Sequence, residues 1–202
     1  MHELIGARFR RQRRKQFERN FPDDRFPRVI DLGGTPQFWG ATSRSVRLVN
    51  IAFSAASSCD NVVCEIGDGT RLVHSDNSFD LAFSNSAIEH LGTRENQRLF
   101  AGEMQRVGRA IYCQTPNRWF PFEVHYWSLF IHWFPRCLNH YFVIRYLTGW
   151  GLLTKPSREQ AIEYHNALKI LTIAEFRELF PDCQIMREKF LWMTKSLIAV
   201  RS

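Results

Sequence analysis

The sequence predicts an α/β protein with a doubly wound, mostly parallel sheet, and three apolar segments support this prediction. The run Val29–Leu32 ends in two glycines, Gly33 and Gly34. Apolar runs of this kind are typical of strands covered on both faces, and glycines at the carboxyl end let the backbone approach a ligand closely. Two further units, at residues 65–69 and 79–83, follow at separations suited to successive strands of one sheet.

The remaining pattern supplies more strands and the helices between them. Residues 46–51 are expected to form the second strand in chain order. Thr93 is suited to cap a helix that ends at Gly108, because apolar residues follow it at spacings of three and four that bury one helix face. These residues are Leu99, Phe100, Met104 and Val107.

The carboxyl-terminal half is expected to complete the sheet. Residues 109–115 favour a strand that ends at Pro116, since proline cannot continue the hydrogen-bond ladder. A capped helix is expected over residues 171–180. Residues 183–190 and 195–200 then favour a final antiparallel pair.

The glycine turn after the first strand and the string Ser84–Leu91 after the fourth resemble class I S-adenosylmethionine-dependent methyltransferases, in particular small bacterial ones. The resemblance covers residues 28–117 best and residues 171–201 in part. It implies a Rossmann-like, doubly wound, seven-stranded sheet with an antiparallel last strand and helices on both faces. It also implies S-adenosylmethionine as the cofactor, S-adenosylhomocysteine as its product, and in-line methyl transfer to an acceptor.

The resemblance assigns the methionine end of the cofactor to Asp31, Gly33 and Gly34. The sequence departs from the family here, because the usual third glycine is absent. At the end of the second strand the family usually carries an acidic residue for the ribose hydroxyls, and this chain has Asn50. An amide still accepts and donates hydrogen bonds, so ribose binding is chemically preserved.

The other cofactor residues follow the third and fourth strands. The resemblance places Asp68 near the adenine amino group, with Gly69 leaving room for the ring. The alternative is a surface turn, because Asp-Gly is a strong turn-forming pair. Ser84 and Asn85 are expected beside the bound methionine.

Three residues are candidates for acid-base or acceptor-positioning chemistry, namely His90, Glu123 and His125. Imidazole titrates near neutral pH, and a glutamate two residues away can orient it. For both histidines the alternative is a packed side chain that hydrogen-bonds to the backbone. Methyl transfer depends mainly on alignment and exclusion of water, so a general base is not required for every acceptor.

Bulk properties favour a single cytoplasmic domain over the 202 residues, with 45% hydrophobic composition. No secretory signal is expected, because residues 1–28 are arginine-rich. The five cysteines form no C-x-x-C pair, so neither a disulfide framework nor a zinc site is expected. His132, Cys137 and His140 lack a fourth ligand, and no metal is expected there.

Residues 1–27 supply most of the net charge of +7 and form a basic amino-terminal segment. Ile5, Phe9 and Phe17 share one face of a predicted helix. The helix is expected to pack on the domain as a lid, to contact an anionic membrane, or to be solvated. Because it contributes no strand, the sheet is expected to stay folded without residues 1–20.

An aromatic insertion is expected over residues 118–165, between the cofactor-binding core of residues 28–117 and the terminal helix and strand pair of residues 166–202. The stretch from Trp119 to Leu147 holds eleven aromatic residues, and charged residues and histidines interrupt it too often for a membrane span. A stretch so rich in aromatic residues favours an apolar or amphiphilic acceptor.

Three functional classes remain open. A methyltransferase for a small or a lipid- or glycan-linked acceptor is favoured. The basic segment would suit a nucleic-acid methyltransferase, but Ser84–Ala87 differs from the motif with which amino-methylating enzymes hold a flipped base. The third class is a non-catalytic protein that keeps the cofactor-binding fold. The oligomeric state does not follow from the sequence.

Overall fold

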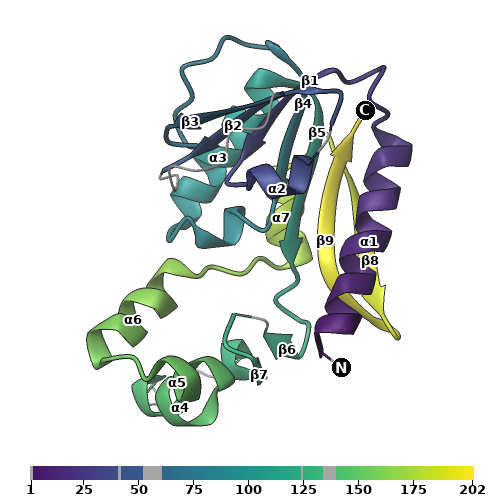
Figure 1. Cartoon of the computed structure of the whole chain (residues 1–202). Helices are drawn as coiled ribbons and strands as arrows, with labels where there is room; N and C mark the ends of the chain where they lie inside the picture. Colours follow the sequence, from purple (N-terminus) through teal and green to yellow (C-terminus); the bar gives the residue numbers. More distant parts are fainter. Residues whose placement is uncertain (1, 41, 52–60, 124, 134–139) are drawn as a thin grey trace.

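A computed structural model describes residues 2–40, 42–51, 61–123, 125–133 and 140–202 (Figure 1). Its centre is a seven-stranded sheet in the order β3-β2-β1-β4-β5-β9-β8. The first five strands are parallel, and β9 is antiparallel to both of its neighbours. The predicted fold class is confirmed, including the antiparallel strand near the end of the sheet.

The strands agree closely with the sequence pattern. In chain order they are β1 (Arg28–Leu32), β2 (Ser45–Asn50), β3 (Val62–Ile66), β4 (Phe79–Asn85), β5 (Gly108–Pro116), β8 (Gln184–Phe190) and β9 (Met193–Arg201). The strand order reverses at β1, which pairs with β2 on one side and β4 on the other. In parallel α/β sheets a crevice opens at this point, beyond the carboxyl ends of the strands.

One face of the sheet is covered by α3 (Arg94–Val107) and α7 (Ile173–Leu179). Thr93 caps α3 by accepting from the Asn96 amide (3.1 Å), and Thr172 forms a capping box with Glu175 at the start of α7. The prediction for Leu99 is wrong, since that side chain is 40% exposed. Gln97 is buried in α3 instead, because its side-chain amide donates to the carbonyls of Ile88 and Lys169, which both lie outside the helix.

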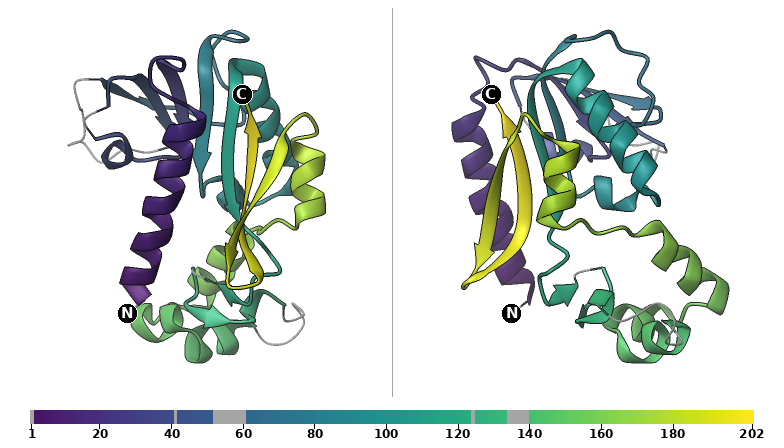
Figure 2. Two further views of the ribbon diagram at one scale, coloured as in Figure 1. Left: turned by 90° about the vertical axis from the view of Figure 1, so that its right-hand side faces the viewer. Right: turned by 180° about the vertical axis from the view of Figure 1, so that it is seen from behind.

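The opposite face is covered by α1 (His2–Asn20) and by α2 (Pro36–Trp39), a single turn that follows the glycines. Figure 2 shows α1 running along the sheet beside β8 and β9. Phe17 is 1% exposed, with its ring centroid 5.0 Å from Phe83 and 5.1 Å from Tyr112. The carboxyl-terminal half of α1 therefore packs on the domain, while Arg11 and Lys15 are exposed.

This packing bears on the expectation that the sheet stays folded without residues 1–20, which stays a prediction. The helix contributes no strand, but it contributes Phe17 to the core that covers the inner strands. The side chains of Ile5 and Phe9 lie outside the described part of the structure. Of the three placements expected for this helix, the second half of α1 therefore has the one in which it packs on the domain.

Residues between β5 and α7 form a separate layer below the carboxyl ends of the strands (Figure 1). It contains the hairpin β6 (Phe122–Glu123) and β7 (Ser128–Leu129), the short η2 (Ile131–Trp133), and three helices. The helices are α4 (His140–Leu147), α5 (Gly149–Thr154) and α6 (Arg158–Ala167). Tyr126, Ile131, Ile144 and Ala161 form a small core of its own.

None of the helices in the described ranges is long and apolar enough to cross a membrane.

We expect Phe17→Ala to lower the free energy of unfolding by about 3–5 kcal/mol, the usual cost of removing a buried phenylalanine side chain. Phe142→Ala is the matched control, because Phe142 is 56% exposed on α4. Urea denaturation followed by circular dichroism measures both variants. Equal stability of the two variants would contradict the assignment of α1 to the core.

Candidate active site

The carboxyl end of β1 holds a buried carboxylate. Asp31 is fully buried, and its Oδ2 accepts a hydrogen bond from Trp39 Nε1 at 2.8 Å. Its Oδ1 has no hydrogen-bond partner in the described structure. Burial raises the pKa of Asp31 to about 7, although the Trp39 hydrogen bond opposes the shift. An unpartnered carboxylate oxygen at this strand end is suited to a cationic group of a ligand.

The two glycines after Asp31 have different structural roles. Gly33 has φ +78°, and a β-carbon there would lie 2.5 Å from that of Ala87. A β-carbon on Gly34 would lie 1.9 Å from Asp31 Oδ2. Both positions therefore require glycine for the turn itself, so a side chain at Gly33 would disturb the protein before it reached a ligand.

The residues expected at the ribose and adenine are engaged in local turns. Asn50 Oδ1 accepts from the Ile51 amide at 2.9 Å. Asp68 Oδ1 accepts from both the amide (2.8 Å) and the hydroxyl (2.7 Å) of Thr70. A β-carbon at Gly69 would lie 2.8 Å from the Phe100 ring. These contacts agree with the surface-turn alternative for Asp68 and Gly69, and they leave the assignment to the cofactor a prediction.

At the end of β4, Ser84 is buried and its hydroxyl donates to the Leu32 carbonyl at 3.0 Å. Asn85 Oδ1 accepts from Arg13 Nη1 of α1 at 2.9 Å. Asn85 lines a cavity of about 450 Å³ between α1, α2 and the sheet. Of the predicted cofactor residues, this cavity is lined by Asn85 alone.

The three candidate acid-base residues lie together, although the sequence separates them. His125 Nδ1 is 2.6 Å from Glu123 Oε1, and the His125 and His90 ring centroids are 4.8 Å apart. Glu123 Oε2 accepts from the Tyr126 amide at 2.8 Å, so both of its oxygens are engaged. Glu123 therefore holds the His125 ring in one orientation.

Glu89, which was not among the predicted site residues, completes this cluster. It is fully buried, and its Oε2 accepts from the Thr115 hydroxyl at 3.0 Å. Burial raises the pKa of Glu89 to about 7. Its position next to His90 in the Glu-His-Leu string was the only sequence signal for it.

The two histidines have opposite pKa shifts. Loss of solvation and repulsion from His125 lower the pKa of His90 to about 4. Burial also opposes a charge on His125, but the hydrogen bond to Glu123 and the attraction of both glutamates outweigh it and raise the pKa of His125.

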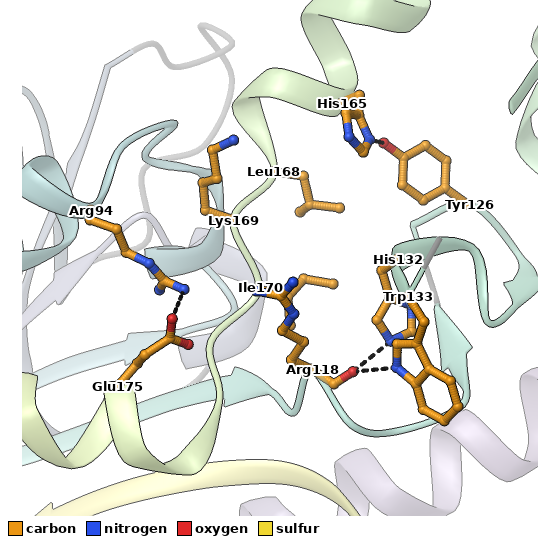
Figure 3. Close-up of a pocket in the computed structure, with 10 residues that line it drawn as sticks. All are labelled: Arg94, Arg118, Tyr126, His132, Trp133, His165, Leu168, Lys169, Ile170 and Glu175. Atoms are coloured by element: carbon orange, nitrogen blue, oxygen red, sulfur yellow. Dashed lines mark hydrogen bonds and ion pairs between the residues drawn. The ribbon is translucent and has the colours of Figure 1, made fainter. Parts of the chain in front are cut away.

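A second cavity, of about 570 Å³, opens between the insertion and the helices α3 and α7 (Figure 3). In it, Tyr126 Oη and His165 Nδ1 are 3.2 Å apart, and the Arg118 carbonyl accepts from His132 Nε2 (2.6 Å) and Trp133 Nε1 (2.8 Å). The remaining lining residues are Arg94, Leu168, Lys169, Ile170 and Glu175. The sequence predicts the aromatic residues of this cavity, which lie between Trp119 and Leu147. It does not predict the basic ones, because Arg94, Arg118 and Lys169 lie outside that stretch.

His132, Cys137 and His140 are the residues at which no metal is expected. Of these, His132 donates a hydrogen bond from Nε2 to the Arg118 carbonyl. Cys137 and the side chain of His140 lie outside the described structure.

A family model described as a methyltransferase domain matches residues 41–110. No protein with a curated description matches the chain. Three solved structures share the fold with TM-scores of 0.55–0.56 at 12–14% identity. One is the methyltransferase domain of a bacterial Hen1 protein, where the match covers 95% of this chain and 98% of that one. The others are a putative methyltransferase in complex with the Trm112 activator of Haloferax volcanii (98% and 93%) and an S-adenosylmethionine-dependent methyltransferase from Mesorhizobium loti (93% and 96%).

The fold and the family match confirm the resemblance to class I methyltransferases, which implies S-adenosylmethionine as the cofactor. The residues of the β1 turn fit this cofactor. Asp31 Oδ1 is a buried acceptor without a partner, and the methionine part of the cofactor carries an ammonium group that requires one.

We expect Gly34→Ala to destabilise the protein by several kcal/mol or prevent folding, because the new methyl group would overlap the Asp31 carboxylate. Gly102→Ala in α3 is the control. Apart from the backbone of α3 itself, no atom of the described residues would lie within 4 Å of its β-carbon, and the usual gain of alanine over glycine in a helix is about 0.5–1 kcal/mol. Thermal denaturation compares the two variants, and a Gly34→Ala protein as stable as wild type would refute the close approach.

Proposed function

We propose that this protein transfers a methyl group from S-adenosylmethionine to a small anionic or amphiphilic acceptor, of the lipid- or glycan-linked kind, bound in the 570 Å³ cavity. The observation that carries the proposal is the composition of that cavity. Three permanent cations, Arg94, Arg118 and Lys169, line it with one carboxylate, Glu175. The surplus of positive charge favours an acceptor with a phosphate or carboxylate group.

The apolar part of the same cavity supports an amphiphilic acceptor. Tyr126, Trp133, Leu168 and Ile170 provide aromatic and aliphatic surface beside the cations. Cavities with a mostly apolar lining and a few placed polar groups are typical of small-molecule sites. Arg94 is already paired with Glu175, so Arg118 is the cation that we assign to the anionic group of the acceptor.

The cofactor supplies an electrophilic methyl group, and the protein binds and aligns the two reactants. We assign the ammonium group of the cofactor to Asp31 and its methionine end to the turn at Gly33 and Gly34. The cluster of His90, Glu123 and His125 is assigned to the acceptor side, because Tyr126 of the cavity follows His125 directly in the chain. Exclusion of water and alignment account for most of the acceleration in such transfers.

Two separate surface features support an acceptor presented at an anionic membrane, one on the insertion and one on α1. Large apolar side chains are exposed on α4 and α5, among them Phe142 (56%), Leu147 (71%) and Leu153 (68%). Arg11, Lys15 and Arg19 are exposed on α1. Apolar side chains together with basic residues are the usual means of binding an anionic lipid surface from one side.

The binding of S-adenosylmethionine is expected to weaken about tenfold to hundredfold in Asp31→Asn, since a hydrogen bond to a charged group contributes about 1.5–3 kcal/mol. In wild type the affinity should rise between pH 6 and 7.5, because the free carboxyl, with a pKa of about 7, must lose its proton to pair with the ammonium. Isothermal titration calorimetry measures both effects. Asp182→Asn, an exposed position before β8, is the control.

A pH-independent affinity in wild type would refute the assignment of Asp31. No binding of S-adenosylmethionine or S-adenosylhomocysteine at millimolar concentration would refute the proposed function as a whole.

In a screen for methyl transfer from labelled S-adenosylmethionine, we expect anionic acceptors to be preferred over neutral ones of similar size. Arg118→Ala should raise KM for the acceptor about tenfold and leave cofactor affinity unchanged, because it removes one charged contact. Arg98→Ala is the control, since Arg98 is exposed on α3 and paired with Glu95. Equal KM values in both variants would contradict the assignment of the cavity.

The same screen includes acceptors in solution and acceptors on vesicles with anionic lipid. Cosedimentation with those vesicles, lost at high salt, is expected for membrane contact. Failure to cosediment would refute the proposed membrane contact, and methyl transfer to an acceptor in solution would remain the proposal.

A further inference from the structure

We propose that Glu89, His90 and His125 form a binding site for a single divalent transition-metal ion of the zinc class. Each residue offers one ligand atom, and these atoms all lie within 4.8 Å of one another. Around one tetrahedral ion at about 2.1 Å, ligand atoms are about 3.4 Å apart. Side-chain adjustments of about 1 Å therefore bring the three atoms to coordination distance.

The buried carboxylate gives an independent reason to place an ion here. Glu89 is fully buried, and among the residues that the structure describes its Oε1 has no hydrogen-bond partner, while Oε2 is engaged by Thr115. A buried polar atom without a partner is costly, and in native structures it usually marks a function or an absent ion or water. A cation between Oε1 and the two imidazoles satisfies this atom and neutralises the carboxylate.

The hydrogen bonds around His125 fix the ring in the form that a metal requires. Both oxygens of Glu123 accept hydrogen bonds, one of them from His125 Nδ1 (2.6 Å). The ring donates through Nδ1, so Nε2 is the nitrogen that faces a metal, and the ion would displace any proton held there. A carboxylate behind a ligating imidazole is the usual outer contact of metal-binding histidines. Glu123 is therefore a positioning residue in this proposal and His125 is a ligand.

The donor set selects the class of metal. Imidazole nitrogens suit zinc, copper, iron and nickel, whereas magnesium and calcium prefer oxygen ligands throughout. Two histidines with one glutamate leave at least one coordination position open for water or another oxygen. If the proposed methyl transfer holds, the hydroxyl of the acceptor is the group that would occupy this position. The metal site itself does not depend on that function.

The site joins two parts of the fold. Glu89 and His90 lie in η1 (Ile88–His90) after β4, while His125 lies in the insertion after β6. An ion held by both parts would fix the insertion against the sheet. Binding should therefore stabilise the whole protein as well as fill the site.

The test uses the full-length protein after dialysis against a chelator. Titration with ZnCl₂ should give one ion per chain, and CoCl₂ should give the visible absorption of a four- or five-coordinate site without a thiolate band. Glu89→Gln and His125→Ala should each weaken zinc binding at least tenfold, and Glu123→Gln should weaken it about 10–100-fold, as expected for an outer contact of a ligand.

His74→Ala is the matched control, because His74 also contacts a carboxylate, Glu65 Oε2, at 3.1 Å, but lies outside the cluster. Its zinc affinity should equal that of wild type. Circular dichroism shows whether each variant is folded. If the ligand variants do not fold, the wild-type protein still tests the proposal. The expected cobalt spectrum and a rise of Tm with zinc would support the metal site, and the absence of both would reject it.

Three results would overturn the proposal: no stoichiometric zinc binding by wild type, unchanged affinity in folded Glu89→Gln and His125→Ala, or a preference for MgCl₂ over ZnCl₂. These readouts need no cofactor. Zinc binding without binding of S-adenosylmethionine would support the metal site and reject the proposed function, and the reverse result would reject the metal site alone.

Discussion

The position of the insertion depends on one junction, where the returning chain is hydrogen-bonded to η1. The Lys169 amide donates to the Glu89 carbonyl at 2.7 Å. Buried Gln97 of α3 donates from Nε2 to the carbonyls of Ile88 (2.9 Å) and Lys169 (2.8 Å). Because one side chain satisfies both segments, the junction cannot open without leaving buried polar groups without partners. It thereby fixes the insertion close to the ends of β4 and β5.

This junction explains why polar groups from distant parts of the chain meet. Glu89 and His90 follow β4, whereas Glu123 and His125 follow β5 across the start of the insertion. The same constraint sets Lys169 and Ile170 beside the aromatic residues of the 570 Å³ cavity. Charge, apolar surface and the histidine cluster are consequently parts of one region, next to the strand ends where this fold binds ligands.

The other face of the sheet is covered by aromatic side chains from two short segments of the chain. The connection between β1 and β2 contains only the single turn of α2, which is too short to cover the strands. Phe17 of α1 and Trp39 of α2 fill that space with Phe83 and Tyr112. Trp39 also donates to Asp31, so the core packing and the candidate cofactor carboxylate are directly linked.

The sequence by itself determined the strands, their class of sheet and the family resemblance, because local apolar runs, caps and glycine turns carry that information. It also singled out His90 and the pair of Glu123 and His125, but as separate candidates. Tertiary structure alone decided that His90 meets this pair, that Glu89 completes the cluster, and that Leu99 is exposed while Gln97 is buried. It likewise placed Phe17 in the core. In each case the deciding contact joins residues far apart in the chain, and helical or strand periodicity does not report which segments will become neighbours.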